Sequence, residues 1–270
     1  SKDRYRKWRI QMVKGLYTAY TGMINEQNRM DIMTNNLANA STVGYKKEGS
    51  TSQSFDDVLT VKIKDQSVGM RNVQRLGVKN PGVKIGENYT DYSQGSFRIT
   101  GNTYDLALSG EGFFAIEFTN KAGETDTKYT RAGQFTLNKD GYLVTEEGDY
   151  VLDTQNRRIR LNTLIDSSIT DDGTIYQNGQ AVAKIQVTDF EDYDYLEKYG
   201  ETYYQPIQGA KTIAAKAQVK SGYLEMANVQ IVSEMVNLIS ITRAYESNQK
   251  VVQTIDDTLD VAVNQIGRVQ

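Results

Sequence analysis

The sequence predicts an α+β fold in which a long helix at each end of the chain flanks a central, mainly β domain. Near both termini, apolar residues recur at alternating four- and three-residue steps, the spacing of helices that pack along a seam. Between them the pattern changes to alternation with frequent glycine turns, which is typical of strands with one buried face. We expect the N- and C-terminal helices to pair as a coiled-coil domain, joined to the β domain by an extended linker region.

The predicted segments follow one another along the chain. They are an extension expected to be disordered (1–11), the N-terminal helix of the coiled-coil domain (12–47), a linker region (48–95), the central β domain (96–208), a return linker (209–220) and the C-terminal helix (221–270). No apolar run of secretory length follows the basic first residues, so we predict no cleaved signal peptide.

The C-terminal helix is the longest predicted element. Between Gly222 and Gly267 the sequence has neither glycine nor proline, which leaves room for roughly 65 to 70 Å of helix at about 1.5 Å per residue. The apolar seam residues that we expect to pack between subunits are Leu224, Ile231, Met235, Leu238, Tyr245, Val252, Leu259 and Ile266. A second apolar row, which calls for more than one neighbour, is Val232, Val236, Ile239, Val251, Ile255 and Ala262. A helix of an internal bundle is the alternative.

The N-terminal helix is expected to run to Ala40 and to end where asparagine, serine and glycine residues follow. Its apolar seam residues, also expected to pack between subunits, are Leu16, Tyr20, Met23, Met30 and Leu37. The linker region allows a short helix over residues 54–59. It also allows a long hairpin that turns at Asn80, Pro81 and Gly82.

Composition limits the chemistry that this chain can perform. It has 270 residues, 24% charged residues, a net charge of -3, and neither histidine nor cysteine. These features argue against nucleic-acid binding, the usual zinc sites and Ser-His-Asp catalysis. A carboxylate pair such as Asp105 and Glu111 suffices for glycoside hydrolysis, but the alternating pattern favours structural roles for both. We therefore predict no enzyme activity, cofactor, metal or membrane insertion.

Several stretches resemble the flagellar rod and hook proteins that build the axial structure of the bacterial basal body. They are LYTAYTGMINEQNRMDIMTNNLANASTVGYKK (16–47), TGNTYDLALSGEGFFAI (100–116), YTRAGQFTLNKDGYLVTEEGDYVL (129–152) and SGYLEMANVQIVSEMVNLISITRAYESNQKVVQTIDDTL (221–259). The match of both ends, in the right order and separation, is more specific than either alone. The acidic, tyrosine-rich residues 191–204 match no pattern of the family.

The resemblance implies a structural subunit of the flagellar rod. Such a subunit polymerises into the helical tube that transmits motor torque to the hook and forms the export channel. Its partners would be copies of itself, other rod and hook subunits and the flagellar export apparatus, and its location the basal body, outside the cytoplasmic membrane. The long linker region favours the distal rod subunit, with the proximal one as the alternative.

The resemblance also favours a polar contact between subunits at Arg243, with a solvated position beside the seam as the alternative. Asn35 and Asn36, two consecutive amides before the end of the helix, are further candidates for pairing with neighbouring chains. A competing hypothesis is a secreted adhesive or carbohydrate-active β protein on a coiled-coil stalk.

Overall fold

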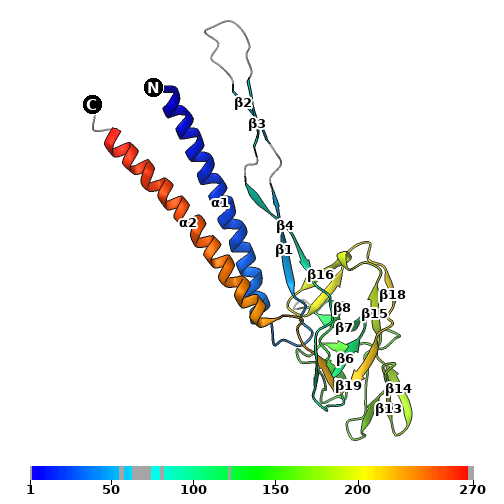
Figure 1. Cartoon of the computed structure of the whole chain (residues 1–270). Coiled ribbons are helices and arrows are strands. Elements are labelled where there is room, and N and C mark those ends of the chain that lie inside the picture. Colours follow the sequence, from blue (N-terminus) through cyan, green and yellow to red (C-terminus); the bar gives the residue numbers. More distant parts are fainter. Residues whose placement is uncertain (1, 55–57, 63–73, 80–81, 121–122, 267–270) are drawn as a thin grey trace. The chain divides into compact units, whose positions relative to one another are not determined.

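The structure is a computed structural model that describes residues 2–54, 58–62, 74–79, 82–120 and 123–266 (Figure 1). It divides into two compact units. The helical unit comprises Ser1–Leu37, Glu48–Thr90 and Ile231–Gln270, and the β unit comprises Ala38–Lys47 and Asp91–Gln230. The chain therefore crosses between the units four times, after residues 37, 47, 90 and 230.

Two long helices, α1 (Lys2–Ala38) and α2 (Ile231–Ile266), form most of the helical unit. They contact each other in antiparallel order. A Cβ atom placed on Gly15 would lie 3.6 Å from Ile255 Cδ1, and one on Gly22 would lie 3.0 Å from Asn248 Nδ2. Further along, the Thr242 hydroxyl lies 3.9 Å from Met30 Sδ. Glycines therefore bring the helices close at two points one heptad apart.

The expectation of a disordered extension over residues 1–11 is wrong, because α1 begins at Lys2. The segment before Gly15 contains no glycine or proline and is rich in arginine and lysine, which are strong helix formers. At its other end α1 stops at Ala38, close to the expected Ala40. Asn39 and Thr42 bond to each other there, and Gly44 adopts a positive φ of 70°.

The linker region forms a two-part antiparallel hairpin within the helical unit (Figure 1). Strand β1 (Glu48–Ser54) pairs with β4 (Val83–Thr90), and β2 (Val58–Lys62) pairs with β3 (Gln74–Lys79). Strands β3 and β4, which flank residues 80–82, pair with β2 and β1 and not with each other, so the described strands do not form the hairpin considered around these residues. Asn80 and Pro81 themselves lie outside the described residues. The ends of the considered helix over residues 54–59 are strands, and residues 55–57 also lie outside the described part.

The β unit is organised around a nine-stranded sheet. Its main path, in spatial order, is β16 (Leu196–Tyr199), β17 (Tyr203–Pro206), β8 (Thr125–Thr130), β7 (Phe113–Thr119), β11 (Tyr150–Val151), β10 (Leu143–Thr145) and β9 (Phe135–Leu137). Strand β15 (Val187–Phe190) also pairs with β7, and β18 (Thr212–Ala214) pairs with β15. A short 3₁₀ helix, Tyr193–Tyr195, precedes β16.

Smaller sheets complete the unit. One consists of β12 (Ser167–Ile169), β13 (Thr174–Gln177) and β14 (Gln180–Lys184). Two ribbons pair β6 (Leu106–Ser109) with β19 (Gln218–Ser221), and β5 (Phe97–Ile99) with β20 (Tyr223–Glu225). Two hydrophobic clusters fill the interior, one around Leu106, Phe114 and Ile175, the other around Phe113, Phe190 and Tyr204. The expected mainly β centre is thus present.

Two boundary predictions near the C-terminus are wrong. Residues 209–220 are not a plain linker, because they contribute β18 and the start of β19. Residues 221–230 are not helical either, since α2 begins only at Ile231. Leu224, a predicted seam residue, instead pairs with Arg98 in the β5–β20 ribbon and is 2% exposed. Burial in the β unit overrides the apolar spacing that continued the helical pattern backwards.

Candidate assembly surface

The seam of α2 that faces inward is offset from the predicted one. Its buried and half-buried residues include a row at four-three steps: Glu234, Leu238, Ile241, Tyr245, Asn248, Val252, Ile255 and Leu259. One predicted column, Leu238, Tyr245, Val252 and Leu259, lies on this row. The other predicted column, which contains Met235, lies one residue after the observed one, and Met235 is 46% exposed. Ile231, at the start of the first column, is also 46% exposed. Polar Asn248 fits this seam because Gly22 leaves room for it. The side chain of Ile266 lies outside the described part.

Helix α1 uses different faces for its two neighbours in the helical unit. Gly15, Gly22 and Met30 contact α2, as described above. On another face, Asn25 accepts a hydrogen bond from the Ser52 hydroxyl of β1 at 3.1 Å. A Cβ atom on Gly82, the residue before β4, would lie 2.5 Å from Thr21 Oγ1. The hairpin therefore covers a polar face of α1 that the sequence pattern left without a partner.

Both helices also carry exposed apolar side chains. On α1, Tyr17, Tyr20 and Ile24 are between 38 and 54% exposed. On α2, the exposed apolar residues are Ile231, Val232, Met235, Val236, Ile239, Val251 and Val261, with Val232 at 76%. We call these two sets the apolar faces of α1 and α2. Five members of the α2 set lie within nine residues, so they form a stripe along its first turns. Contiguous exposed apolar surface of this kind is typical of interaction sites.

The predicted packing residues divide between these environments. Leu16, Met23, Met30 and Leu37 of α1 are half-buried, whereas Tyr20 belongs to its apolar face. Of the polar candidates, Arg243 is exposed on α2 and Asn35 is half-buried. Asn36 is fully buried, and its amide donates to the carbonyl of Glu48 at 2.8 Å and accepts from the N–H of Glu48 at 2.9 Å. The Asn36 side chain therefore joins the end of α1 to the first residue of β1 in the same chain.

Sequence reasoning missed a cluster of buried charges in the β unit, which we call the Glu225 cluster: Lys46, Arg131 and Glu225. Lys46 Nζ lies 2.7 Å from Glu225 Oε1, and Arg131 Nη1 lies 3.2 Å from Glu225 Oε2. All three side chains are at most 4% exposed. Burial lowers the pKa of Lys46, although the neighbouring Glu225 carboxylate opposes the shift. No spacing in the sequence signals this cluster, because its members are 85 to 179 residues apart.

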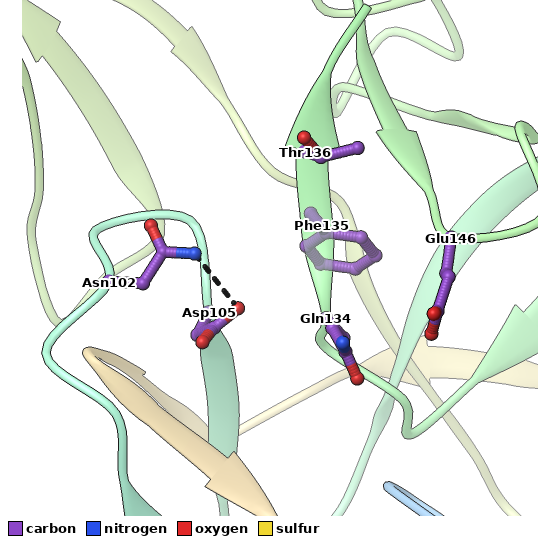
Figure 2. Close-up of a pocket in the computed structure, with 6 residues that line it drawn as sticks. All are labelled: Asn102, Asp105, Gln134, Phe135, Thr136 and Glu146. Carbon is purple, nitrogen blue, oxygen red and sulfur yellow. Dashed lines mark hydrogen bonds between the residues drawn. The ribbon is translucent and has the colours of Figure 1, made fainter.

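The β unit also has a shallow pocket, of about 240 Å³, beside β9. Figure 2 shows its lining residues, Asn102, Asp105, Gln134, Phe135, Thr136 and Glu146. The Asn102 amide donates to Asp105 Oδ1 at 3.2 Å across a tight turn, so this carboxylate has a structural partner. The pocket brings Asp105 together with Glu146, while Glu111 is not among its lining residues. It therefore does not assemble the carboxylate pair considered from the sequence.

No helix in the described part of the chain is long and apolar enough to cross a membrane. The described residues also contain no group of three or more acidic side chains placed to hold a metal ion.

Comparison with known protein families gives three matches. Residues 16–46 match the family described as "Flagella basal body rod protein". Residues 107–179 match "Flagellar hook protein FlgE/F/G D1 domain", and residues 220–266 match "Flagellar basal body rod FlgEFG protein C-terminal". The first and last matches coincide with the two terminal stretches that carried the resemblance.

Individual relatives are similar over nearly their whole length. The chain is 34% identical to the flagellar basal-body rod protein FlgG of Bacillus subtilis, with 94% of this chain and 99% of the relative aligned. It is 34% identical to FlgG of Caulobacter vibrioides, over 92% of this chain and 97% of the relative. It is 32% identical to the rod protein FlgF of the same organism, with 96% of this chain and 100% of the relative aligned. The chain therefore belongs to the family of flagellar basal-body rod proteins.

Proposed function

We propose that this protein is a structural subunit of the bacterial flagellar rod and performs no catalysis. Copies pack through their terminal helices into a helical tube that transmits torque from the motor to the hook and encloses the export channel. Neighbouring rod and hook subunits bind at its ends, and the flagellar export apparatus delivers the chain to the basal body, outside the cytoplasmic membrane, without a cleaved signal peptide. Membership of the rod protein family supports the structural role.

The apolar faces of α1 and α2 carry this proposal. Within the helical unit, α1 and α2 already contact each other through a different side of each helix. We propose that this contact is a coiled-coil pair whose apolar faces remain for other copies. The two faces differ in composition, since two of the three residues on α1 are tyrosines and the α2 set contains no aromatic residue. Contacts between unlike faces are heterologous, and when they do not close into a ring they generate a helical assembly.

Among rod subunits, we assign the chain to the distal rod, with the proximal rod as the alternative. The support is the pairing of β1 with β4 and of β2 with β3 in the described part of the linker region, together with the contact of Ser52 in β1 with Asn25 of α1. Paired strands of this kind are suited to stiffening contacts between subunits. Locating tagged protein in isolated basal bodies tests the assignment, because a signal in another part of the basal body contradicts it.

The first test separates the apolar face of α2 from its inner seam. Val232→Asp adds a charge at a position that is 76% exposed, so the soluble monomer should change in stability by less than about 0.5 kcal/mol. In the assembled rod the same charge would be buried without a partner, at a cost of several kcal/mol per subunit, on the order of 2 or more. We expect normal helical circular dichroism in the monomer, but incomplete rods and no motility.

Asn237→Asp is the matched control, because Asn237 is an exposed polar residue on the same helix. It adds the same charge and should leave motility unchanged. Cells that carry Val232→Asp and still swim with complete rods would show that the apolar face of α2 is not an assembly surface.

A second test concerns Leu238, which is half-buried on the inner seam. Leu238→Asp should weaken the contact of α2 with α1 in the monomer itself and also stop rod growth. The β unit should keep its circular-dichroism signal, because Leu238 belongs to the helical unit. A monomer whose helical signal and stability equal those of the wild type would contradict the seam position.

A further inference from the structure

We propose that the Glu225 cluster, Lys46, Arg131 and Glu225, acts as a lock on the β unit. Residues 38–47 pack stably in this unit only when the segment around Glu225, from near the other end of the chain, is bound in place. This inference concerns the folding of the single chain and does not depend on the proposed role in the rod. It assigns to Glu225 a positioning function that neither the sequence pattern nor the family matches indicate.

Glu225 is the centre of the lock, because one carboxylate satisfies three separate segments. Its Oε1 accepts from Lys46 Nζ at 2.7 Å and from the N–H of Gly95 at 2.9 Å. Its Oε2 accepts from Arg131 Nη1 at 3.2 Å. The side chain of Glu225 is 0% exposed, so water cannot replace any of these donors without opening the structure. The loss of this carboxylate therefore affects all three segments at once.

The charges of the lock are unequal, with two cations around one anion. Removing the negative charge would leave the Lys46 and Arg131 cations buried together, and the charge of Arg131 already contributes to lowering the pKa of Lys46. Their other acceptors are neutral carbonyls, of Ser93 for Lys46 and of Gly110 for Arg131. An uncompensated buried charge is strongly destabilising. The closed arrangement is thus favourable only with Glu225 in place.

Backbone hydrogen bonds around the lock depend on the same closure. The N–H of Gly44 donates to the carbonyl of Glu225 at 2.8 Å, and the N–H of Met226 donates to the carbonyl of Ser96 at 2.9 Å. Asn228 accepts from the N–H of Lys47 at 2.8 Å and donates to the carbonyl of Asp91 at 2.8 Å. These bonds join residues 44–47, 91–96 and 225–228, which adjoin three of the four crossings between the units.

The members of the lock come from three distant parts of the chain. Lys46, Arg131 and Glu225 lie one in each of the segments that match the three family descriptions. None of them is a member of the two hydrophobic clusters, and their one printed ring contact with a cluster is that of the Arg131 guanidinium, 5.3 Å from the centroid of Phe113. Opening the lock should therefore release residues 44–47, 91–96 and 225–228 together while the central strands stay folded.

Amide hydrogen exchange on the soluble, full-length monomer tests this directly. Glu225→Gln keeps the shape of the side chain and removes its charge. We expect exchange at the amides of Gly44, Gly95 and Met226 to become faster by about a hundredfold or more, as for a buried ion pair that loses one partner. Exchange in β7 and β8 should stay within about threefold of the wild type, because these strands belong to the core.

Glu117→Gln is the matched control, since it removes a carboxylate that pairs with the more exposed Arg158 in the same unit. It should leave exchange at Gly44, Gly95 and Met226 unchanged. Acceleration at these amides in the control, equal to that in Glu225→Gln, would overturn the proposal.

A rescue experiment distinguishes charge balance from packing. Lys46→Met removes one of the two cations, so Glu225→Gln combined with Lys46→Met should exchange at least about tenfold more slowly at Gly95 than Glu225→Gln alone. A role in packing alone predicts that the double variant exchanges as fast as the single one, or faster. That result would overturn the proposal, as would unchanged exchange in Glu225→Gln or simultaneous loss of protection in β7 and β8.

Discussion

The β unit and the helical unit differ in how completely they bury their own apolar residues. In the β unit, Phe113, Phe114 and Ile116 on neighbouring positions of one strand are all 0% exposed. In the described part of the helical unit, the buried hydrophobic residues are only Ala19, Ile32 and Ile241, while many valines and isoleucines of α2 are exposed. The β unit therefore has the interior of an independently stable domain. The helical unit has surfaces that gain stability only by association.

The largest difference between the units should appear in hydrogen exchange of the wild-type monomer. Amides of α2 over residues 245–262 should exchange on the order of a hundredfold faster than those of β7 and β8, because few buried contacts hold that part of the helix. Mass-spectrometric exchange with peptides from both units measures this ratio. Equal protection throughout Ile231–Ile266, with no assembled species present, would show that the helical unit is stable by itself.

A large effect on stability is expected at Phe114. Its ring is fully buried and meets Phe135 edge to face, with the centroids 5.2 Å apart. Phe114→Ala should destabilise the β unit by about 3 to 5 kcal/mol, through lost burial and the cavity left behind. Denaturant unfolding followed by circular dichroism measures the change. Ile99→Ala, at a position that is 74% exposed, is the control and should cost less than about 0.5 kcal/mol.

The smallest effect concerns pH. Burial and the nearby Glu147 raise the pKa of the Asp149 carboxyl, while its hydrogen bond from Tyr203 opposes the rise. A raised pKa in the folded state means that Asp149 favours folding in acid and that this contribution is lost as pH rises through the folded pKa. The free energy of unfolding of Asp149→Asn, minus that of the wild type, should therefore increase as the pH is raised from about 3.5 to about 7.

The gain from Asp149→Asn should be roughly a few tenths of a kcal/mol, because the half-buried carboxyl is partly screened by water. Thermal unfolding at both pH values measures it, and Asp140→Asn, at an exposed turn position, is the control. A difference between Asp149→Asn and wild type that does not change with pH would show that Asp149 titrates alike in the folded and unfolded chains.

Sequence reasoning was most successful where one local pattern determines the structure. Helical spacing located α1 and α2, and alternation with glycine turns located the β unit. It failed where distant residues decide. The pattern around Leu224 fits a helix, yet pairing with β5 makes it a strand. One of the two predicted columns of the α2 seam was displaced by one residue, because Asn248 packs against Gly22. These two residues are 226 positions apart in the sequence. The Glu225 cluster has no local signal at all.

The hydrogen bond between Gly44 and Glu225 also changes the entropy of pairing α1 with α2. Along the chain, Ala38 and Ile231 are separated by 193 positions. Once the β unit is folded, the Gly44–Glu225 hydrogen bond provides a shorter connection between the helices, with 6 positions from Ala38 to Gly44 and 6 from Glu225 to Ile231. Shortening a loop from 193 to 12 residues lowers the closure entropy cost by about 2.5 kcal/mol. The folded β unit thus raises the effective concentration of each helix near the other, so that a weak pairing can form in a single molecule.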